Sequence, residues 1–244
     1  MDSTLVPWFA PKASPALASI VRNLGHKTPH GKGDVLYESG SLFSRVVFVN
    51  SGVVARSVLV PGFEDSPFFI SLALPGSLVG CVDTLYVKDQ VHRKQWAVTS
   101  CDTLTVQKEI FLQLADHEPT WRSALESYNA RMMLAVRLGM LVTRAGTMEQ
   151  RVAAFIYSFC RRSDPLFDEM LLDQEKEWIP IPALPPKKLI AQIITSDIQL
   201  LEEVENKWLG SGVMTPVKRA VFLKKEILIS NREWLSRFLG AFGS

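Results

Sequence analysis

The sequence predicts an α+β protein in which a β-rich N-terminal half precedes a helical C-terminal half. Three observations predict this class. Short β-prone runs separated by glycine turns fill roughly residues 25–110, and a proline-free helical pattern follows from about 118 to 162. The last quarter then contains two short helical patterns followed by a β-hairpin pattern. Many short strands with regular turn signals indicate a barrel, a roll or a sandwich in the first half.

The composition excludes several classes of protein. The chain has 244 residues, 47% of them apolar and 21% charged, which is enough apolar material for one large or two modest domains. Its formal net charge is only +2, so a nucleic-acid surface would have to be local. Three widely spaced cysteines form no zinc pattern, and no segment has the pattern of a signal peptide or a membrane span. We therefore expect a cytoplasmic protein without membrane contact and without a metal site.

The β-rich region begins after a short amphipathic helix, which we predict at residues 13–24. Its two last strands are predicted at Gln95–Ser100 and Thr103–Gln107. The glycines that separate the earlier runs are Gly33, Gly40, Gly52 and Gly62.

The long helical pattern carries an apolar stripe whose members recur at alternating steps of four and three residues. This heptad spacing predicts a helix that pairs with a second copy of the chain, and small residues in the stripe would let two backbones approach closely. A second stripe, Leu134, Leu138 and Leu141, predicts burial on another side. The alternative is a core helix of a monomeric domain. The predicted dimer interface consists of Trp121, Leu125, Tyr128, Met132, Ala135, Gly139 and Val142.

The C-terminal part predicts a winged helix-turn-helix. An acidic, poorly periodic segment at 163–178 is interpreted as a solvated connector. Helices are then predicted at Lys187–Ile194 and about Asp197–Leu209, with Thr195 or Ser196 as the N-cap of the second helix. The run "VMTPVKRAVFLKKEILIS" predicts a basic hairpin, and "NREWLSRFLGAF" a closing helix.

Four segments in this order resemble the CRP/FNR family of bacterial transcription regulators. They are "KGDVLYESGSLFSRVVFVNSGVV", "LPGSLVGCVDTLYV", "EQRVAAFIYSF" and "LIAQIITSDIQLLEEVENKWLGSGVM". The resemblance implies a double-stranded β-helix (a β-roll like the cyclic-nucleotide-binding domain), a long dimerisation helix and a C-terminal winged helix-turn-helix. It places a sensory domain at residues 1–115, the dimerisation helix at 116–146 and the winged helix at 147–244. It also implies a homodimer whose partners are DNA and RNA polymerase or another regulator.

The resemblance places an effector pocket at Gly80, Cys81, Asp83, His92, Arg93 and Lys94. Cys81 stands where cyclic-nucleotide-binding members carry the glutamate that holds the ribose, and the serine of their Arg-Ser pair is absent, so we expect no cAMP binding. No N-terminal cysteine cluster supports an iron–sulfur cluster. Nothing singles out one haem ligand among His26, His30, His92 and His117, and these are interpreted as solvated or structural histidines. No cofactor is therefore identified. Residues 92–94 can equally be interpreted as an exposed turn before a strand.

The second helix of the predicted motif is acidic, which is unusual for a helix that enters a DNA groove. The three positions at which the family reads bases fall on Ile198, Gln199 and Glu203, so both arginines are absent. Repulsion between Glu203 and phosphate would cost a few kcal/mol, against about 1–3 kcal/mol for each bidentate base contact. Nine cations and six anions between residues 184 and 237 still leave the segment mildly basic. The predicted DNA-binding residues are Lys187, Lys188, Thr195, Ser196, Gln199, Lys218, Arg219 and Lys224. The alternative for these lysines is ordinary solvated surface.

Two functions follow from the sequence. The first is a dimeric regulator of the CRP/FNR type that binds DNA through the winged helix. The second is a degenerate relative that no longer reads DNA and regulates through protein–protein interaction. An enzyme is not expected, because the sequence has no phosphate loop, no GxSxG, no HExxH and no recognisable catalytic spacing.

Overall fold

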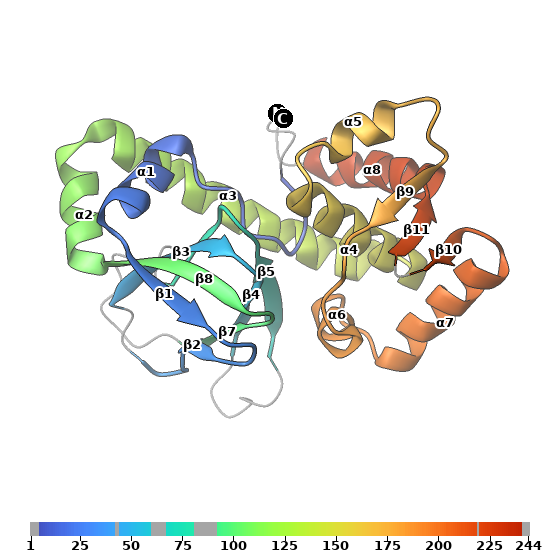
Figure 1. Ribbon diagram of the computed structural model, residues 1–244, viewed down its shortest axis with the longest axis horizontal. Coiled ribbons are helices and arrows are strands. Elements are labelled where there is room, and N and C mark those ends of the chain that lie inside the picture. Colours follow the sequence, from blue (N-terminus) through green and yellow to red (C-terminus); the bar gives the residue numbers. More distant parts are fainter. Residues whose placement is uncertain (1–4, 42–43, 60–66, 81–91, 219, 241–244) are drawn as a thin grey trace. The chain divides into compact units, whose positions relative to one another are not determined.

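The computed structural model of the chain describes residues 5–41, 44–59, 67–80, 92–218 and 220–240 (Figure 1). It confirms the predicted α+β class. The chain divides into two compact units. One is Phe9–Ala135, and the other comprises the described residues of Met1–Trp8 and Val136–Ser244. The boundary between the units falls inside the long helix rather than at its two predicted ends.

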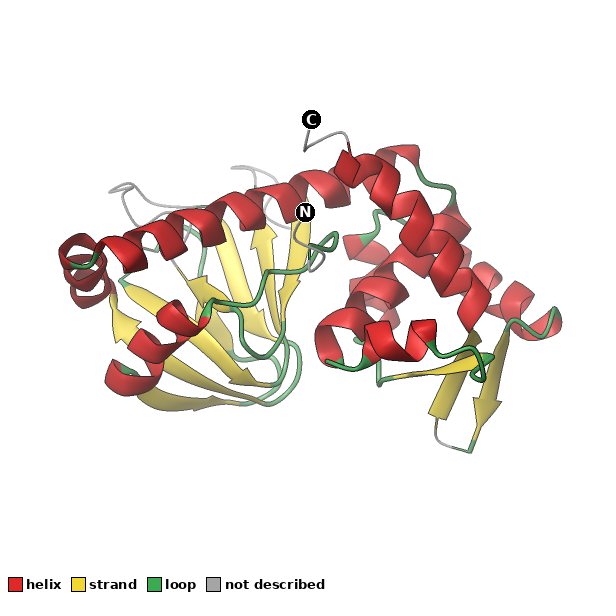
Figure 2. Cartoon of the chain, turned by 90° about the horizontal axis from the view of Figure 1, so that it is seen from above, coloured by secondary structure: helices red, strands yellow, loops and turns green. Residues whose placement is uncertain are grey.

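In its described residues, the first unit is a β-roll made of two four-stranded antiparallel sheets (Figure 2). One sheet has the order β1 (His26–His30), β8 (Cys101–Gln107), β3 (Arg45–Ser51) and β6 (Leu78–Gly80). The other has the order β2 (Val35–Tyr37), β7 (Arg93–Ala97), β4 (Val54–Val58) and β5 (Phe69–Ala73).

Two helices cover the outer side of the first sheet. They are α1 (Pro15–Leu24) and α2 (Lys108–His117), and both pack against β3 and β8. The hydroxyl of Ser14 caps α1 by accepting a hydrogen bond from the backbone N–H of Leu17. The guanidinium of Arg22 lies 5.6 Å from the ring centroid of Phe48 on β3. The short amphipathic helix predicted before the β region is therefore confirmed.

Strand β6 lies at one edge of its sheet, where backbone groups lack a strand partner. Two side chains supply the missing hydrogen bonds. The hydroxyl of Tyr128 accepts from the N–H of Leu78 at 2.9 Å and donates to its C=O at 2.8 Å. The amide of Gln95 accepts from the N–H of Gly80 at 3.0 Å and donates to its C=O at 3.1 Å. This edge is therefore closed within the chain.

The long helix α3 (Pro119–Ala145) corrects the predicted dimer interface. Leu125, Tyr128, Met132 and Ala135 are each no more than 2% exposed, because they pack inside their own chain. Within the same stripe, Gly139 and Val142 are also buried and Trp121 is half-buried. The prediction that this stripe meets a second copy is wrong. A heptad spacing shows that a face is covered but does not show which chain covers it.

The second unit contains the remaining helices and a three-stranded sheet. Its helices are α4 (Met148–Ser163), α5 (Phe167–Leu172), α6 (Lys187–Ile193), α7 (Ile198–Gly210) and α8 (Lys225–Gly240). Its sheet has the order β10 (Met214–Val217), β11 (Ala220–Lys224) and β9 (Trp178–Ile181). A capping box formed by Thr147 and Gln150 starts α4. Trp8 is buried in the core of this unit, with its ring centroid 6.4 Å from that of Phe155.

Two predicted elements differ from the structure. The segment interpreted as a solvated connector contains α5, whose Phe167 and Leu171 are buried. The closing helix begins at Lys225, so the hairpin ends at Lys224. Leu228 and Leu235 of α8 are buried two helical turns apart. Their burial on one helix face outweighs the weak helix propensity of the β-branched residues beside them.

Candidate functional site

The helix-turn-helix is formed by α6 and α7, but its cap differs from the prediction. Asp197 is the N-cap of α7, and its carboxylate accepts from the N–H of Leu200 at 2.8 Å. Thr195 lies in the turn with a left-handed φ of 55°. Ser196 directs its hydroxyl to the C=O of Asp197. The prediction that Thr195 or Ser196 caps this helix is therefore wrong, because both belong to the turn that precedes the cap.

Carboxylates of this unit hold two of the cations near the turn. The ammonium group of Lys187, at the start of α6, lies 2.5 Å from a carboxylate oxygen of Glu205 and 3.5 Å from one of Glu202. The hydrogen bond that the Lys187 ammonium donates to the Glu205 carboxylate raises the pKa of Lys187. Lys207, the one cation in the sequence of α7, forms an ion pair with Glu149 of α4. Lys187, a predicted phosphate contact, therefore partly neutralises the acidic helix.

The exposed face of α7 is acidic and apolar. Gln199, Glu202 and Glu203 are exposed on it. Two leucines, Leu200 and Leu209, are 43% and 42% exposed. The one cation of this helix, Lys207, is paired with Glu149, while the Gln199 amide has both a donor and an acceptor for a base edge.

The wing carries the other predicted phosphate contacts. Lys218 stands at the tip of the β10–β11 hairpin with a left-handed φ of 55°. Lys224, at the end of β11, lies 3.8 Å from a carboxylate oxygen of Glu177. Lys188 of α6 is exposed. Arg219 lies outside the described residues. The cations that flank α7 therefore lie at the start of α6 and at the tip of the wing.

The effector pocket implied by the sequence lies partly outside the described residues, so its formation stays a prediction. The backbone groups of Gly80 are occupied by the Gln95 amide. His92 is exposed, and Arg93 and Lys94 follow it on β7, where Lys94 lies 3.6 Å from Glu38. Cys81 and Asp83 lie outside the described residues.

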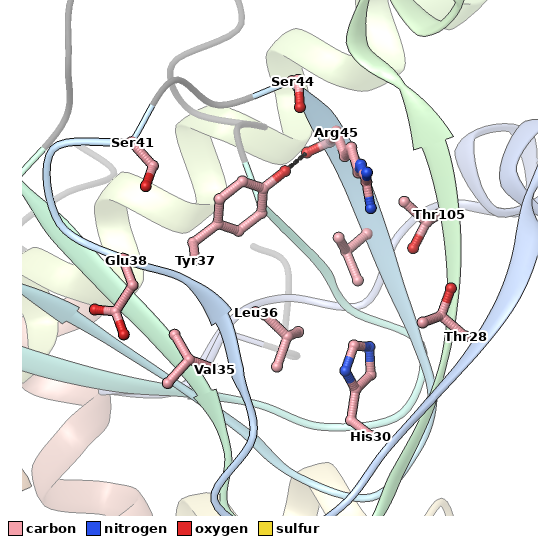
Figure 3. A pocket seen from close by; sticks show the side chains of 11 residues that line it. Thr28, His30, Val35, Leu36, Tyr37, Glu38, Ser41, Ser44, Arg45 and Thr105 are labelled. Carbon is pink, nitrogen blue, oxygen red and sulfur yellow. Dashed lines mark hydrogen bonds between the residues drawn. The ribbon is translucent and has the colours of Figure 1, made fainter.

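The β-roll instead contains a cavity of about 380 Å³ beside strands β1 and β2 (Figure 3). None of the predicted pocket residues that the structure describes lines it. Sequence reasoning missed this site because it set His30 aside as a solvated or structural histidine. The alternation of polar His26, Thr28 and His30 along one face of a strand is the signal that could have found it. The cavity is lined by Thr28, His30, Val35, Leu36, Tyr37, Glu38, Ser41, Ser44, Arg45, Val47 and Thr105.

Hydrogen bonds fix two walls of this cavity. The hydroxyl of Thr103 donates to the C=O of Thr28 at 3.2 Å. It therefore accepts from Nε2 of His30, which lies 3.1 Å away. On the other side, the hydroxyl of Tyr37 donates to the C=O of Arg45 at 2.8 Å. The positions of the imidazole and of the Arg45 backbone are therefore set before any ligand binds.

The two cysteines that the structure describes, Cys101 and Cys160, are both buried. Burial raises the pKa of the Cys160 thiol to about 12, and it also raises the pKa of Cys101. Both thiols are therefore poor nucleophiles at neutral pH. In the described part of the chain, no three His, Cys, Asp or Glu side chains are placed to hold a metal ion. No described helix has the length and hydropathy that a membrane crossing needs.

Comparison with known proteins finds similarity in structure only. No protein-family model matches the sequence, and neither does any curated protein. The solved structure of FixK2 from Bradyrhizobium japonicum is 15% identical, with a TM-score of 0.68 over 88% of this chain and 96% of that one. The chain has the fold of the CRP/FNR regulators. A mutant of CooA from Carboxydothermus hydrogenoformans is 14% identical, with a TM-score of 0.64 over 89% and 90% of the two chains.

The transcriptional regulator TTHB099, of the CRP family from Thermus thermophilus, is also 14% identical. Its TM-score is 0.58 over 86% of this chain and 96% of that one. All three similarities span both the β-roll and the winged helix-turn-helix, so the order of parts inferred from the sequence is supported at the level of the fold.

Proposed function

We propose that the protein is a dimeric transcription regulator of the CRP/FNR type, in which a β-roll controls a DNA-binding winged helix. One observation carries this proposal. The fold of known regulators extends over 88% of the chain and includes the β-roll, the long helix and the helix-turn-helix in one order. Similarity limited to the β-roll, or limited to the winged helix-turn-helix, would not have pointed to a regulator, because each of these folds occurs in proteins of many functions.

The exposed face of α3 is the surface that we assign to the dimer. Ala130, Leu134, Arg137 and Leu141 follow one another at steps of four, three and four residues, which is a heptad seam. Met133 and Met140 beside this seam are 49% and 41% exposed. A second copy would bury these apolar side chains, which water otherwise covers. The dimer face is therefore opposite the stripe that the sequence predicted.

The charge distribution around α7 defines how DNA would bind. Lys188 and Lys218 would contact phosphates on either side of the helix, helped by the Thr195 hydroxyl. Gln199 is the base-reading side chain that remains, and adenine is the base it would contact. Glu203 opposes the phosphate field. We therefore expect weak sequence selection and an affinity that falls steeply with salt.

Fluorescence anisotropy with labelled genomic fragments tests this function. At about 50 mM salt we expect saturable binding, lost by about 200 mM because phosphate contacts carry it. Glu203→Arg should strengthen binding to every fragment, because it replaces repulsion by attraction. The charge-matched control is Glu109→Arg, at an exposed position of α2 outside the second unit, which should change little. No binding by either the original chain or Glu203→Arg at low salt would refute DNA binding.

We also propose that cAMP is not the effector. The Gln95 amide occupies the backbone groups of Gly80, and Cys81 replaces the carboxylate that would hold the ribose. Adding cAMP in the anisotropy experiment should therefore leave the DNA affinity unchanged.

A second function is favoured by the acidic and apolar face of α7. Lys187 is held by Glu205, and Leu200 and Leu209 stay exposed on a helix that shows no free cation among the described side chains. Such a face suits a protein partner, such as RNA polymerase or another regulator, better than a polyanion. A dimer that binds no DNA at low salt would support this function over the first.

A further inference from the structure

A second cavity lies inside the winged-helix unit, away from the β-roll. Helices α7 and α8 both pack against α4 (Figure 1), and residues of all three helices line this cavity. Its volume is about 180 Å³, which is smaller than the sites that hold drug-sized ligands and suits a molecule of a few heavy atoms. None of the predicted DNA-binding residues that the structure describes lines it.

Two indole rings contribute to the wall of this cavity. Trp208 of α7 is buried, and Trp234 of α8 is half-buried with its ring in edge contact with Phe238, at a centroid distance of 4.9 Å. Ala153 and Ile227 add apolar surface to the lining. Indole is the aromatic side chain that attracts cations most strongly, and the same surface accommodates a short hydrocarbon chain.

The polar part of the lining is rich in hydrogen-bond acceptors. Glu149 is its one charged side chain, because no Lys or Arg of the described residues lines the cavity. Asn231 is only 4% exposed, and its Nδ2 donates to the C=O of Gln150 at 3.1 Å. Its Oδ1 is buried and accepts no hydrogen bond from the described residues. A carboxylate and an unpaired amide oxygen favour a ligand that brings N–H donors and positive charge.

Glu149 has hydrogen-bonding capacity that its ion pair does not use. The ammonium of Lys207 donates to Oε1 of this carboxylate, and no described residue donates a hydrogen bond to Oε2. Both side chains of the pair are accessible, with 42% of Glu149 and 68% of Lys207 exposed. An exposed ion pair of this kind is weak, so a second cation can compete for the carboxylate.

We propose that this cavity binds a small primary ammonium ion, with its N–H groups at Glu149 and Asn231 and its alkyl chain against Trp208 and Trp234. A neutral alcohol would leave the carboxylate without a new counter-ion, and an anion would be repelled by it. A quaternary ammonium would satisfy the indoles but would bring no donor for the two acceptors.

The ligand would compete with Lys207 for Glu149, and this links the cavity to α7. Lys207 follows Gln199 and Glu203 at steps of four residues, which places it toward the same side of the helix. Released from Glu149, it would give this acidic helix a cation for phosphate. DNA and the ammonium ion would then favour each other's binding. Ammonium binding stands independently of DNA, while this coupling rests on the proposed function.

NMR of the full chain labelled with ¹⁵N-tryptophan tests the binding, with n-butylammonium as the probe at constant ionic strength. Among the six indole N–H signals, we expect those of Trp208 and Trp234 to shift saturably. Trp208→Phe and Trp234→Phe assign them. The neutral isostere n-butanol should bind roughly 10- to 100-fold more weakly, and tetramethylammonium should also bind more weakly. No shift of either signal, or equal binding of n-butanol or tetramethylammonium, would overturn the proposal.

Variants locate the site. Glu149→Gln should weaken n-butylammonium binding by about tenfold or more. Glu169→Gln is the matched control, because it removes an exposed carboxylate in the first turn of α5 that does not line the cavity. Ser230→Phe adds a second test, since this exposed lining residue would then fill the cavity and abolish binding. Unchanged affinity in Glu149→Gln and Ser230→Phe, each with an unaltered circular dichroism spectrum, would place any binding elsewhere.

Lys207→Gln tests the competition. It should bind n-butylammonium several-fold more tightly than the original chain, because the carboxylate no longer has an internal partner. An unchanged affinity would show that Lys207 and the ligand do not share Glu149.

Repeating the DNA anisotropy measurement with n-butylammonium at constant ionic strength separates this inference from the proposed function. The affinity for DNA should rise several-fold in the original chain and stay unchanged in Lys207→Gln. A chain that binds n-butylammonium but not DNA keeps the cavity assignment and loses the regulator. A chain that binds DNA but not n-butylammonium does the reverse. Equal DNA affinity with and without bound n-butylammonium would overturn the coupling.

Discussion

Tyr128 shows at the scale of one residue what a sequence pattern conceals. Its position in a heptad stripe predicts an apolar contact, and its ring is indeed buried. Its hydroxyl, however, completes the backbone hydrogen bonds of Leu78 on an edge strand far away in the sequence. Periodicity reports burial but carries no information about a polar partner 50 residues distant, so this role could not be predicted.

Tyr128→Phe isolates that role, because it removes the hydroxyl and keeps the ring. Both backbone groups of Leu78 would remain buried without a partner, so we expect the free energy of unfolding to fall by about 1–3 kcal/mol. Denaturant unfolding followed by circular dichroism measures the change. Ser127→Ala at the exposed neighbouring position is the control and should have little effect. A Tyr128→Phe chain as stable as the original would mean that water replaces the hydroxyl.

At the scale of elements, the sequence predicted the helix-turn-helix closely. Helix α6 starts at the predicted residue, Lys187, and Pro186 is its N-cap. The two prolines prevent an earlier start, because proline has no backbone N–H for a helical hydrogen bond. The cap of α7 was misplaced by one or two residues, because Thr195, Ser196 and Asp197 are all good N-caps in isolation. The left-handed φ of Thr195 excludes that residue, and the hydrogen bond from the Leu200 N–H to the Asp197 carboxylate identifies Asp197 as the cap. Neither feature is visible in the composition.

Asp197→Ala should therefore weaken the start of α7. Loss of the hydrogen bond to the Leu200 N–H should lower the free energy of unfolding by about 0.5–2 kcal/mol. Asp197→Asn, which keeps an acceptor of the same size, should retain most of the stability. Thermal or denaturant unfolding of the three chains measures this. If Ser196→Ala, rather than Asp197→Ala, proves the destabilising change, then the cap lies at the residue that the sequence predicted.

At the scale of the whole molecule, the order of the β-roll, the long helix and the helix-turn-helix could be predicted from the sequence. The position of the cavity and the side of α3 that packs against the roll could not. Short strands, a long helix and a final helix-turn-helix leave separate signals along the chain, and their order resembles one family. The cavity beside His30 draws residues from β1, β2, β3 and β8, so it exists only after the roll closes. The two faces of α3 are both apolar in part, and sequence alone cannot assign one to the roll and the other to a partner.

The exposed seam of α3 gives the prediction that decides the quaternary structure. Leu141 lies in the seam and is 37% exposed, so Leu141→Asp should place a charge between two copies and convert a dimer into a monomer. Arg137 occupies a seam position where two guanidinium groups would face each other in a parallel pair. Arg137→Leu should therefore tighten the dimer by about tenfold or more, because it replaces like-charge repulsion by apolar contact.

Light scattering coupled to gel filtration at micromolar concentration measures both effects. Leu172→Asp is the matched control, because this leucine is 68% exposed on α5 and lies outside the seam. It should leave the mass unchanged. A chain that is already a monomer, and stays one in Arg137→Leu, would remove the dimer. A palindromic DNA target is expected only because the two winged helices of a dimer would contact two half-sites about 34 Å apart. A monomer would therefore remove this expectation as well.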